Sequence, residues 1–556
     1  MTASRQQGVS LDFQSHLADL ERRGLLVHID EPINKDTELH PLVRCQFVGG
    51  VAEQDRRAFL FTNVIDSTGK KYGMPVAVGA LAASPEIYSI GMGCAVEEIS
   101  GKWMKAIANP VQPVEVTSAP CQEVVITGRD LTKPGGGLAM LPVPVSTPGF
   151  DAAPTLTATL CITKDPDSGI PNMSMNRAAL KSTNRLSVRM ASRLGRTGGY
   201  LHWQKYQKMG KPMPIAIVLG CAPVVVYNGP QRLPTDFDEI TVAGALAGQP
   251  IQVVKAKTVD LMVPANGEIV IEGLISTALL EPEGPFGEST GYVALEDYNL
   301  SMEITAITHR RSPVFPSIIS QVTPSESSVM RKVAMEPVFL THLRQIGISG
   351  VRKVVMHETL SNLRPLLFLQ FANGVTRTEI WRALQSASSR IADCGKIVIA
   401  VSEDVDPNNA NAVFWSMAYR SNPIEDLQVL PFRAPDHGPS SDSGSNTPQD
   451  PRTANSTLLI DATLKHVMPP IALPAKPYME RARELWTRLK LAPISFQAPW
   501  HGYQLGDWSD DWEKFAQNAT AGKWEENGAN TFARRRGGMK PETPVRSLER
   551  EGGSGS

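Results

Sequence analysis

The pattern of hydrophobic and polar positions divides the chain into three stretches of different character. In the first, Phe13, Leu17 and Leu20 fall on one face of a helix for which Ser10 is the expected N-cap. The following LLVHI has the composition of a strand, and SPEIYSIGMGCAVEEISGKWMKAI has helical periodicity interrupted at its glycines. This pattern predicts an N-terminal α/β domain over residues 1–115.

The second stretch contains many short strands separated by Gly and Pro. The segments with strand character are CQEVVITG, TLTATLCIT, PIAIVLG, PIQVVKA, GEIVIEG and MEITAITHR. Such a succession is typical of a β-barrel or a sandwich. We therefore expect a β-rich middle domain over residues 116–325.

In the third stretch, strands alternate with helices. SESSVMRKVAMEPVFLTHLRQ predicts a helix, after which three apolar strands alternate with two helical segments, which indicates an α/β domain over residues 326–475. Within it, residues 432–456 are rich in Ser, Pro, Asp and Gly and predict a mobile loop. Residues 476–551 predict a helix that begins after Pro477 and a tail, and residues 552–556, GGSGS, resemble an appended linker. The predicted fold class is thus multi-domain, α+β or α/β.

Composition and charge argue against some classes of binding partner and indicate a cellular compartment. Lys and Arg number 55 against 56 Asp and Glu, so the chain offers no polybasic surface for nucleic acid or an anionic membrane. The six cysteines are scattered without a C-x-x-C pair, as expected for free thiols in a reducing compartment. The N-terminus lacks a targeting pattern, and no apolar run is long enough to span a membrane. These features predict a cytoplasmic protein.

Common catalytic signatures are absent or lie in the wrong context. Gly91 and Gly93 begin a G-x-G without its third glycine, and neither a P-loop nor an H-E-x-x-H motif occurs. GESTG, Gly287–Gly291, matches the nucleophile elbow of serine hydrolases, with Ser289 as the nucleophile. That motif requires a strand, a sharp turn and a helix, whereas Pro285 precedes it here and strand-like sequence follows. A serine hydrolase remains as a disfavoured alternative.

The segment EPEGPFGESTGY carries Glu283 and Glu288 around a Gly-Pro-Phe-Gly centre. Gly284, Pro285 and Gly287 allow the backbone to fold tightly, so that both carboxyl groups could enter one cavity. There, repulsion and burial would keep one of them protonated near neutral pH, and such a group can donate a proton to carbon. The alternative is a Gly/Pro turn with two solvated acids.

Two further segments carry polar side chains that could join these glutamates. In PNMSMNR, Asn172 and Arg177 follow a strand and a turn, and Arg177 could pair with Glu283 or bind a substrate carboxylate in a forked geometry. The alternative is an arginine at a strand edge. Glu239 falls in the first turn of a predicted helix, where the helix dipole alone would favour an acid.

Together, these pieces resemble the UbiD family of decarboxylases, which includes ferulic acid decarboxylase and the 3-polyprenyl-4-hydroxybenzoate carboxy-lyases. The most specific element is E-G-P-F-G-E-x-x-G-Y; N-x-x-x-x-R, VKAKTVDLMVPANGEIVIEG and VSEDVDPNNANAVFWSMAYRSNP support it. The similarity extends from about residue 10 to about residue 470. It implies a split β-barrel, flavin-reductase-like cofactor domain between the N-terminal α/β segment and a C-terminal α/β oligomerisation domain.

The resemblance also implies an activity and its cofactors. The family removes CO₂ reversibly and without oxidation from aromatic, heteroaromatic or α,β-unsaturated carboxylic acids. Departure of CO₂ from an sp² carbon leaves an electron pair that no side chain can take up, so a cofactor must do so. In the family this is prenylated FMN, supplied by a flavin prenyltransferase, with Mn²⁺ or Mg²⁺ and often K⁺ at its phosphate. A homodimer or a higher homo-oligomer is also implied.

Site residues are carried over by the same resemblance. Arg177, Glu283 and Glu288 match the family's Arg-Glu-Glu network, with Glu288 as the proton donor. Asn172 and Glu239 match two metal ligands, and oxygen donors suit Mn²⁺ or Mg²⁺. The implied cofactor-binding residues are Asn172, Ser174, Met175, Asn176, Arg177, Ala178 and Glu239.

The sequence departs from the family pattern at two positions. The third metal ligand is a histidine downstream of the arginine; His202 is the candidate here, although it is further from Arg177 than usual. Thr457 stands where many members place a lysine near the cofactor. Retention of the complete Arg-Glu-Glu set argues against the remaining alternative, a non-catalytic cofactor-binding or assembly homologue.

Overall fold

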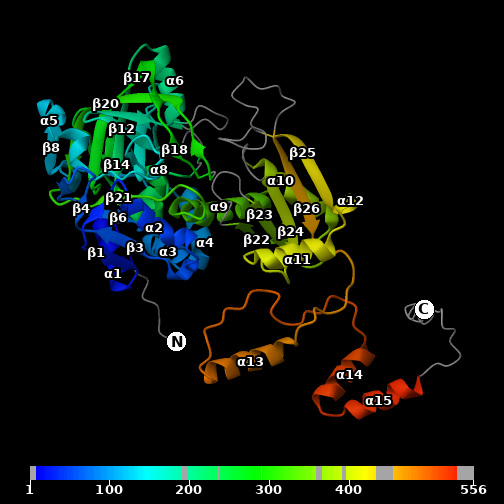
Figure 1. Cartoon of the computed structure of the whole chain (residues 1–556). Coiled ribbons are helices and arrows are strands. Elements are labelled where there is room, and N and C mark those ends of the chain that lie inside the picture. Colours follow the sequence, from blue (N-terminus) through cyan, green and yellow to red (C-terminus); the bar gives the residue numbers. More distant parts are fainter. Residues whose placement is uncertain are drawn as a thin grey trace. The chain divides into compact units, whose positions relative to one another are not determined.

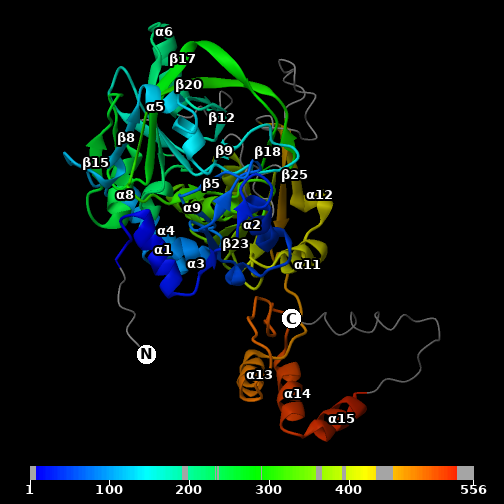
Figure 2. The ribbon, with the colours of Figure 1, turned by 60° about the vertical axis from the view of Figure 1, so that its left-hand side comes forward.

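The structure is a computed structural model that describes residues 8–190, 198–231, 233, 237–289, 291–357, 366–390, 396–433 and 455–534. The chain forms two compact units, Met1–Thr463 and Leu464–Ser556. Figure 1 shows the elements in order along the chain, and Figure 2 shows them from a second direction. Apart from its ends, the predicted mobile loop 432–456 lies outside the described residues, as does 552–556.

The N-terminal segment contains a four-stranded sheet with helices beside it. The strand order is β1-β3-β6-β21, and a small sheet, β2-β4-β5, adjoins it. The elements are α1 (Phe13–Arg22), β1 (Leu26–Ile29), β2 (Ile33–Asn34), α2 (Leu39–Val48), β3 (Ala58–Phe61), β4 (Val64–Ile65), β5 (Lys71–Tyr72), β6 (Val76–Val78), α3 (Pro85–Met92) and α4 (Ile99–Ala108).

The opening helix and strand predicted from the sequence are confirmed, except for the N-cap. Phe13, Leu17 and Leu20 are buried, as predicted. Asp12 caps the helix, because its carboxylate accepts a hydrogen bond from the Ser15 backbone N–H at 2.7 Å. The predicted N-cap, Ser10, was wrong: its hydroxyl donates to Asp19 instead.

A nine-stranded, mainly antiparallel sheet forms the centre of the first unit. Its order is β11-β10-β14-β17-β20-β13-β12-β9, with β8 paired to β20, and the path of described strands is open. Its elements and their neighbours are β7 (Val114–Glu115), β8 (Val124–Thr127), α5 (Arg129–Thr132), β9 (Thr155–Leu156), β10 (Thr159–Lys164), β11 (Pro171–Ser174), β12 (Ala178–Ser182), β13 (Arg185–Val188), α6 (Gly198–Lys208), β14 (Met213–Leu219), α7 (Pro223–Val226), α8 (Glu239–Ala247), β15 (Gln252–Lys255), β16 (Met262–Pro264), β17 (Ile269–Glu283), β18 (Phe286–Gly287), β19 (Val293–Ala294), β20 (Asp297–His309) and β21 (Phe315–Ser317).

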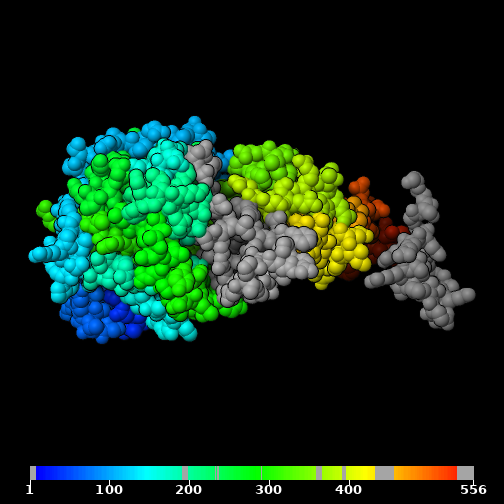
Figure 3. Space-filling model, turned by 90° about the horizontal axis from the view of Figure 1, so that it is seen from above, coloured from blue at the N-terminus to red at the C-terminus, as the bar shows by residue number. Residues whose placement is uncertain are grey.

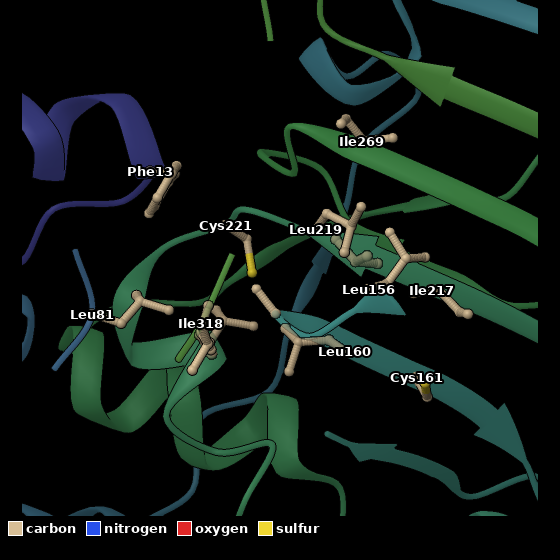
Figure 4. Close-up of a cluster of buried hydrophobic side chains, with 14 of the residues drawn as sticks. Phe13, Leu81, Leu156, Leu160, Cys161, Ile217, Leu219, Cys221, Ile269 and Ile318 are labelled. Atoms are coloured by element: carbon tan, nitrogen blue, oxygen red, sulfur yellow. The ribbon is translucent and has the colours of Figure 1, made fainter. Parts of the chain in front are cut away.

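The first two segments share one hydrophobic core. Figure 4 shows Phe13 of α1, Leu160 of β10, Leu219 of β14 and Ile269 of β17 in this cluster of buried side chains. Because β21 pairs with β6, the chain returns to the N-terminal sheet after it has completed the central one. The core therefore joins both segments.

The C-terminal part of the first unit is a five-stranded sheet with the order β22-β23-β24-β26-β25. Its elements are α9 (Glu326–Gln345), β22 (Val351–Met356), β23 (Leu366–Phe371), α10 (Arg377–Ser389), β24 (Ile397–Ser402), α11 (Ala410–Arg420), α12 (Pro423–Asp426), β25 (Leu427–Arg433) and β26 (Asn455–Ala462). Side chains of α9 and α10 pack in one apolar cluster and those of α11 in another. The predicted alternation of strands and helices is confirmed.

The second unit contains α13 (Lys476–Arg488), α14 (Asp510–Thr520) and α15 (Trp524–Ala533). The predicted helix near Pro477 is confirmed, although it begins one residue before that proline. None of these three helices has a buried residue. In the described parts of the whole chain, no helix is both long and apolar enough to cross a membrane.

Candidate active site

Arg177 lies between the two glutamates singled out in the sequence. Its Nε and Nη2 donate to Oε1 and Oε2 of Glu283 at 3.1 and 2.9 Å, which is the forked arrangement of a bidentate pair. Its Nη1 donates to Oε1 of Glu288. The guanidinium also lies over the Phe286 ring, 4.3 Å from the centroid. The three residues predicted to act together are thus in direct contact.

The glutamates lie where the two longest central strands are joined. Glu283 is the last residue of β17 and stands opposite Asp297, the first residue of β20. Between them, β18 and β19 form a small hairpin, and Glu288 directly follows β18. The acidic segment is therefore the end of a strand followed by a tight hairpin.

At two positions of this segment, neighbouring atoms lie so close to the backbone that only glycine fits without a shift. A Cβ on Gly284 would overlap the Ala152 Cβ, and a Cβ on Gly287 would overlap the Thr147 hydroxyl. Residues 147–152 also bind the segment through polar contacts, since the Gly287 N–H donates to Asp151 at 2.8 Å. The Gly-Pro-Phe-Gly sequence therefore lets the glutamate-bearing chain lie directly on this loop.

The two carboxyl groups have different surroundings. Glu283 is 3% exposed, and its Oε2 accepts a hydrogen bond from the Asn299 amide at 2.8 Å as well as one from Arg177. In the described part of the chain, the Glu288 carboxylate pairs with Arg177 alone, and its side chain is 17% exposed. Both oxygens of Glu283 thus have hydrogen-bond partners, whereas Glu288 retains an oxygen for another partner.

The GESTG sequence does not form a nucleophile elbow. Ser289 lies in the turn after β18, and the chain continues into strand β19. A nucleophile elbow would continue into a helix. The geometry therefore gives the serine-hydrolase alternative no support.

The predicted metal ligands Asn172 and Glu239 are in contact. The Asn172 Nδ2 donates to Oε1 of Glu239 at 2.9 Å, and the Met173 backbone N–H donates to Oε2 at the same distance. Burial raises the pKa of Glu239 to about 7. Among the described residues, the buried Oδ1 of Asn172 has no hydrogen-bond partner, which is costly unless a ligand completes it.

His202 lies on α6, one turn after Gly198, which is packed against the Asn172 amide. Its Nδ1 is 2.9 Å from the hydroxyl of Thr163, the register partner of Asn172 in the β10–β11 pair. Burial lowers the pKa of His202 to about 4, so the ring is neutral at physiological pH, as a metal ligand must be. The asparagine oxygen, glutamate oxygen and imidazole nitrogen are donors that suit Mn²⁺. Among the described residues, no group of three or more His, Cys, Asp or Glu side chains could hold a metal ion, but the set proposed here includes an asparagine.

The segment predicted to line the cofactor connects these two clusters. The Met175 N–H donates to the Gly229 carbonyl at 3.0 Å, and the Thr159 hydroxyl donates to the Asn176 carbonyl at 2.6 Å. The Asn176 amide donates to the Ser174 hydroxyl, and Ala178 begins β12. Hydrogen bonds to two separate segments of the chain therefore fix the backbone of residues 174–178.

Thr457, the other departure from the family pattern, is a buried residue of β26 and stands opposite Leu430 of β25. The sequence did not single out Asp151, Asn299, Arg189 or Asp297, although all four contact the acidic segment or its partners. Asp297 and Asn299 alternate on β20, which is a pattern that could have indicated a polar face on that strand.

Three domain families match consecutive parts of the chain. They are the N-terminal, Rift-related and C-terminal domains of 3-octaprenyl-4-hydroxybenzoate carboxy-lyase, which match residues 17–107, 112–322 and 328–462. An uncharacterized protein of Synechocystis sp. is 28% identical over 443 residues, which cover 76% of this chain and 84% of that protein.

Solved structures share the architecture. An evolved dimeric form of the UbiD-class enzyme HmfF from Pelotomaculum thermopropionicum, in complex with prFMN, superposes with a TM-score of 0.71 at 28% identity over 84% of this chain and 97% of that one. The apo 3,4-dihydroxybenzoic acid decarboxylase of Enterobacter cloacae has the same TM-score at 24% identity, over 88% and 98% of the two chains, and so shows the fold alone. The multi-domain fold and the family predicted from the sequence are confirmed. The chain belongs to the UbiD family and is a carboxy-lyase.

Proposed function

We propose that the chain catalyses the reversible, non-oxidative decarboxylation of an aromatic, heteroaromatic or α,β-unsaturated carboxylic acid with prenylated FMN. The observation that carries the proposal is the guanidinium of Arg177, which lies between a fully paired carboxylate, Glu283, and a partly exposed one, Glu288. Complexes of the UbiD-class relative HmfF with prFMN and with FMN support the choice of cofactor.

Glu288 is the proton donor in this proposal. Glu283 receives hydrogen bonds from Arg177 and Asn299, and their loss on protonation would leave donors unpaired in a buried site. In the described part of the chain, Glu288 has one such partner, so its protonation would leave fewer donors unpaired than that of Glu283. Arg177 and Glu283 orient the substrate carboxylate and hold Glu288 beside the carbon that receives the proton.

The residues present fit the implied cofactor and metal. When bound, prenylated FMN supplies the electron sink for the pair left on carbon when CO₂ departs. Asn172, Glu239 and His202 would hold Mn²⁺ or Mg²⁺ at its phosphate, because the unpaired Asn172 oxygen, the Glu239 carboxylate and the neutral imidazole are suitable donors. The resemblance adds K⁺ at the same phosphate and a flavin prenyltransferase as supplier.

The same proposal extends to architecture and assembly. The open nine-stranded sheet would be the split-barrel cofactor domain, placed between an N-terminal α/β domain over 1–115 and a C-terminal α/β oligomerisation domain over 326–475. The latter would form a homodimer or a higher homo-oligomer. A cytoplasmic location fits the five described cysteines, all of which are free thiols.

The test is CO₂ release by the wild-type chain, co-produced with a flavin prenyltransferase, from a panel of benzoic, cinnamic and heteroaromatic acids. Glu288→Gln should keep the flavin absorption and lower kcat by about 10²–10⁴-fold, which is typical of a lost general acid. Ser289→Ala is the matched control and should retain kcat. A Glu288→Gln variant with wild-type turnover, or a Ser289→Ala variant without turnover, would contradict the assignment.

A further inference from the structure

A second arginine faces the carboxylate of Glu283. Arg189 directly follows β13, and its backbone N–H donates to the Arg177 carbonyl at 3.0 Å, so the two residues are neighbours across adjacent strands. Its Nη1 lies 3.8 Å from Glu283 Oε2 and also 3.8 Å from Asp297 Oδ2. The Arg189 side chain is only 15% exposed.

The charges around Arg177 indicate why a second cation is needed there. One guanidinium, Arg177, contacts two carboxylates, so this trio alone carries a net negative charge when both acids are ionised. An uncompensated charge in a buried site is strongly unfavourable. Arg189 supplies the balancing positive charge, and Asp297, which is half exposed, balances Arg189 when Glu288 is protonated.

Burial and the neighbouring Arg177 guanidinium lower the pKa of Arg189. Two further cations flank the Glu283 strand but are engaged elsewhere. Lys181 donates to the Pro282 carbonyl, and Arg185, which is 47% exposed, pairs with Glu281 at 3.1 Å. Of the cations in the described residues around Glu283, Arg177 and Arg189 are therefore the two that face its carboxylate.

We propose that Arg189 is a positioning residue, shared between Glu283 and Asp297, that keeps the Arg177–Glu283 pair in place while Glu288 changes its charge. Both of its ion pairs are long, so a small movement of the guanidinium can strengthen one and weaken the other. The inference rests on the proposed function insofar as Glu288 gains and loses a proton during turnover.

The test compares Arg189→Met with Arg189→Lys, and with Arg185→Met as a matched control at the start of β13. Arg189→Met should lower kcat by about 10²-fold with little change in KM, because displacement of catalytic groups costs rate more than affinity. The acidic limb of its pH–rate profile should move to higher pH, since the ionised acid pair has lost a cation. Arg189→Lys should restore most of kcat, and Arg185→Met should behave as wild type.

A second readout does not require activity. The difference in Tm between wild type and Arg189→Met should widen as the pH rises, because loss of a neighbouring cation disfavours the ionised form of a carboxylate. In Arg185→Met, the change of this difference with pH should be smaller, because the Arg185–Glu281 pair is more exposed to solvent. Asp297→Asn should add little to the loss of stability in Arg189→Met, as expected when two residues share one interaction.

These outcomes separate the two proposals. If the wild-type chain decarboxylates none of the acids, the proposed function fails, and the Tm comparison still decides the role of Arg189. If the wild type is active and Arg189→Met matches Arg185→Met in kcat, pH profile and Tm, the role of Arg189 is overturned and the proposed function stands.

Discussion

At the level of single residues, Asn172 provides a test of whether the Asn172–Glu239 pair binds a metal ion or has only a structural role. Its Nδ2 donates to Glu239, whereas no described residue provides a partner for its buried Oδ1. We predict that Asn172→Ala lowers the affinity for Mn²⁺ by at least about tenfold, the effect of losing even an indirect contact to a metal. Elemental analysis of the purified holoenzyme measures this loss.

The matched control for that measurement is Asn176→Ala, because the Asn176 amide donates to the Ser174 hydroxyl rather than to Glu239. This variant should keep its metal. Equal metal content in both variants would show that the Asn172 oxygen is not a ligand.

The sequence predicted the residues to which we assign the proposed chemistry better than it predicted their partners. Arg177, Glu283 and Glu288 stand in a specific motif and were predicted together. Asn299 and Arg189 were missed because their contacts depend on strand register, and the β17–β20 pair contains two register shifts. A pattern of residues along one strand does not specify which residue of the neighbouring strand stands opposite.

At the level of elements, the acidic hairpin is in close contact with the loop before β9. This contact can be tested with a disruptive substitution and a second substitution that compensates for it. Gly284→Ala would place a Cβ against that of Ala152 and should lower the free energy of unfolding by about 1–3 kcal/mol, as overpacking does. It should also lower kcat, since Glu283 is adjacent.

The double variant Gly284→Ala/Ala152→Gly removes the overlapping methyl group, because the remaining neighbour, the Ala152 Cα, lies 3.8 Å from the new Cβ. Denaturant unfolding and turnover should both recover towards wild type. If the double variant is no better than the single one, the close contact is not the cause of the loss.

The first turn of α9 carries a buried acid that links it to the N-terminal segment. Glu326 accepts hydrogen bonds from the backbone N–H groups of Gly79, Leu81 and Ala82, and burial raises its pKa to about 7. Because this pKa is higher than the unfolded value of 4.5, the protonated form stabilises the fold. That contribution is complete below about pH 4.5 and declines as the pH rises through about 7.

We therefore predict that Glu326→Gln flattens the pH dependence of stability between about pH 5 and about pH 7. Chemical denaturation at several pH values gives the slope for each protein. Glu239 and Glu336 also have pKa values raised to about 7 by burial, so the difference between wild type and variant isolates the contribution of Glu326. An unchanged slope would contradict the prediction.

Periodicity predicted the elements well where one face is buried, as in α1 and α10. It was less informative about ends: the N-cap is Asp12 rather than Ser10, and β17 continues for 15 residues into the acidic segment. The second half of β17 is partly exposed and is fixed by its pairing with β20, an interaction between distant segments that a local pattern does not contain.

At the level of the whole molecule, the three described helices of the second unit contain no buried residue. Large side chains of its helices remain exposed, including Trp512, Trp524 and Phe532. Exposed aromatic side chains in this number are typical of a surface that is covered by another chain. In the proposed oligomer, a second copy would cover them.

We predict that a chain ending at residue 463 still folds, because the first unit contains all the described central and C-terminal sheets. It should form a smaller assembly than the full chain. Light scattering measures both masses, and circular dichroism checks the fold. If the truncated and the full-length chain form assemblies of the same number of chains, the second unit takes no part in oligomerisation.

Because β6 pairs in parallel with β21, an expressed fragment that contains one strand without the other has an incomplete N-terminal sheet. A fragment that stops at residue 115 would lack the three residues Phe315–Ser317 that cover one edge of β6. Its exposed backbone N–H and C=O groups would then be available to other chains, and such fragments tend to aggregate. Expression of the N-terminal segment alone is therefore a poor route to a well-behaved protein, whereas a circularly permuted chain that keeps both strands would preserve the sheet.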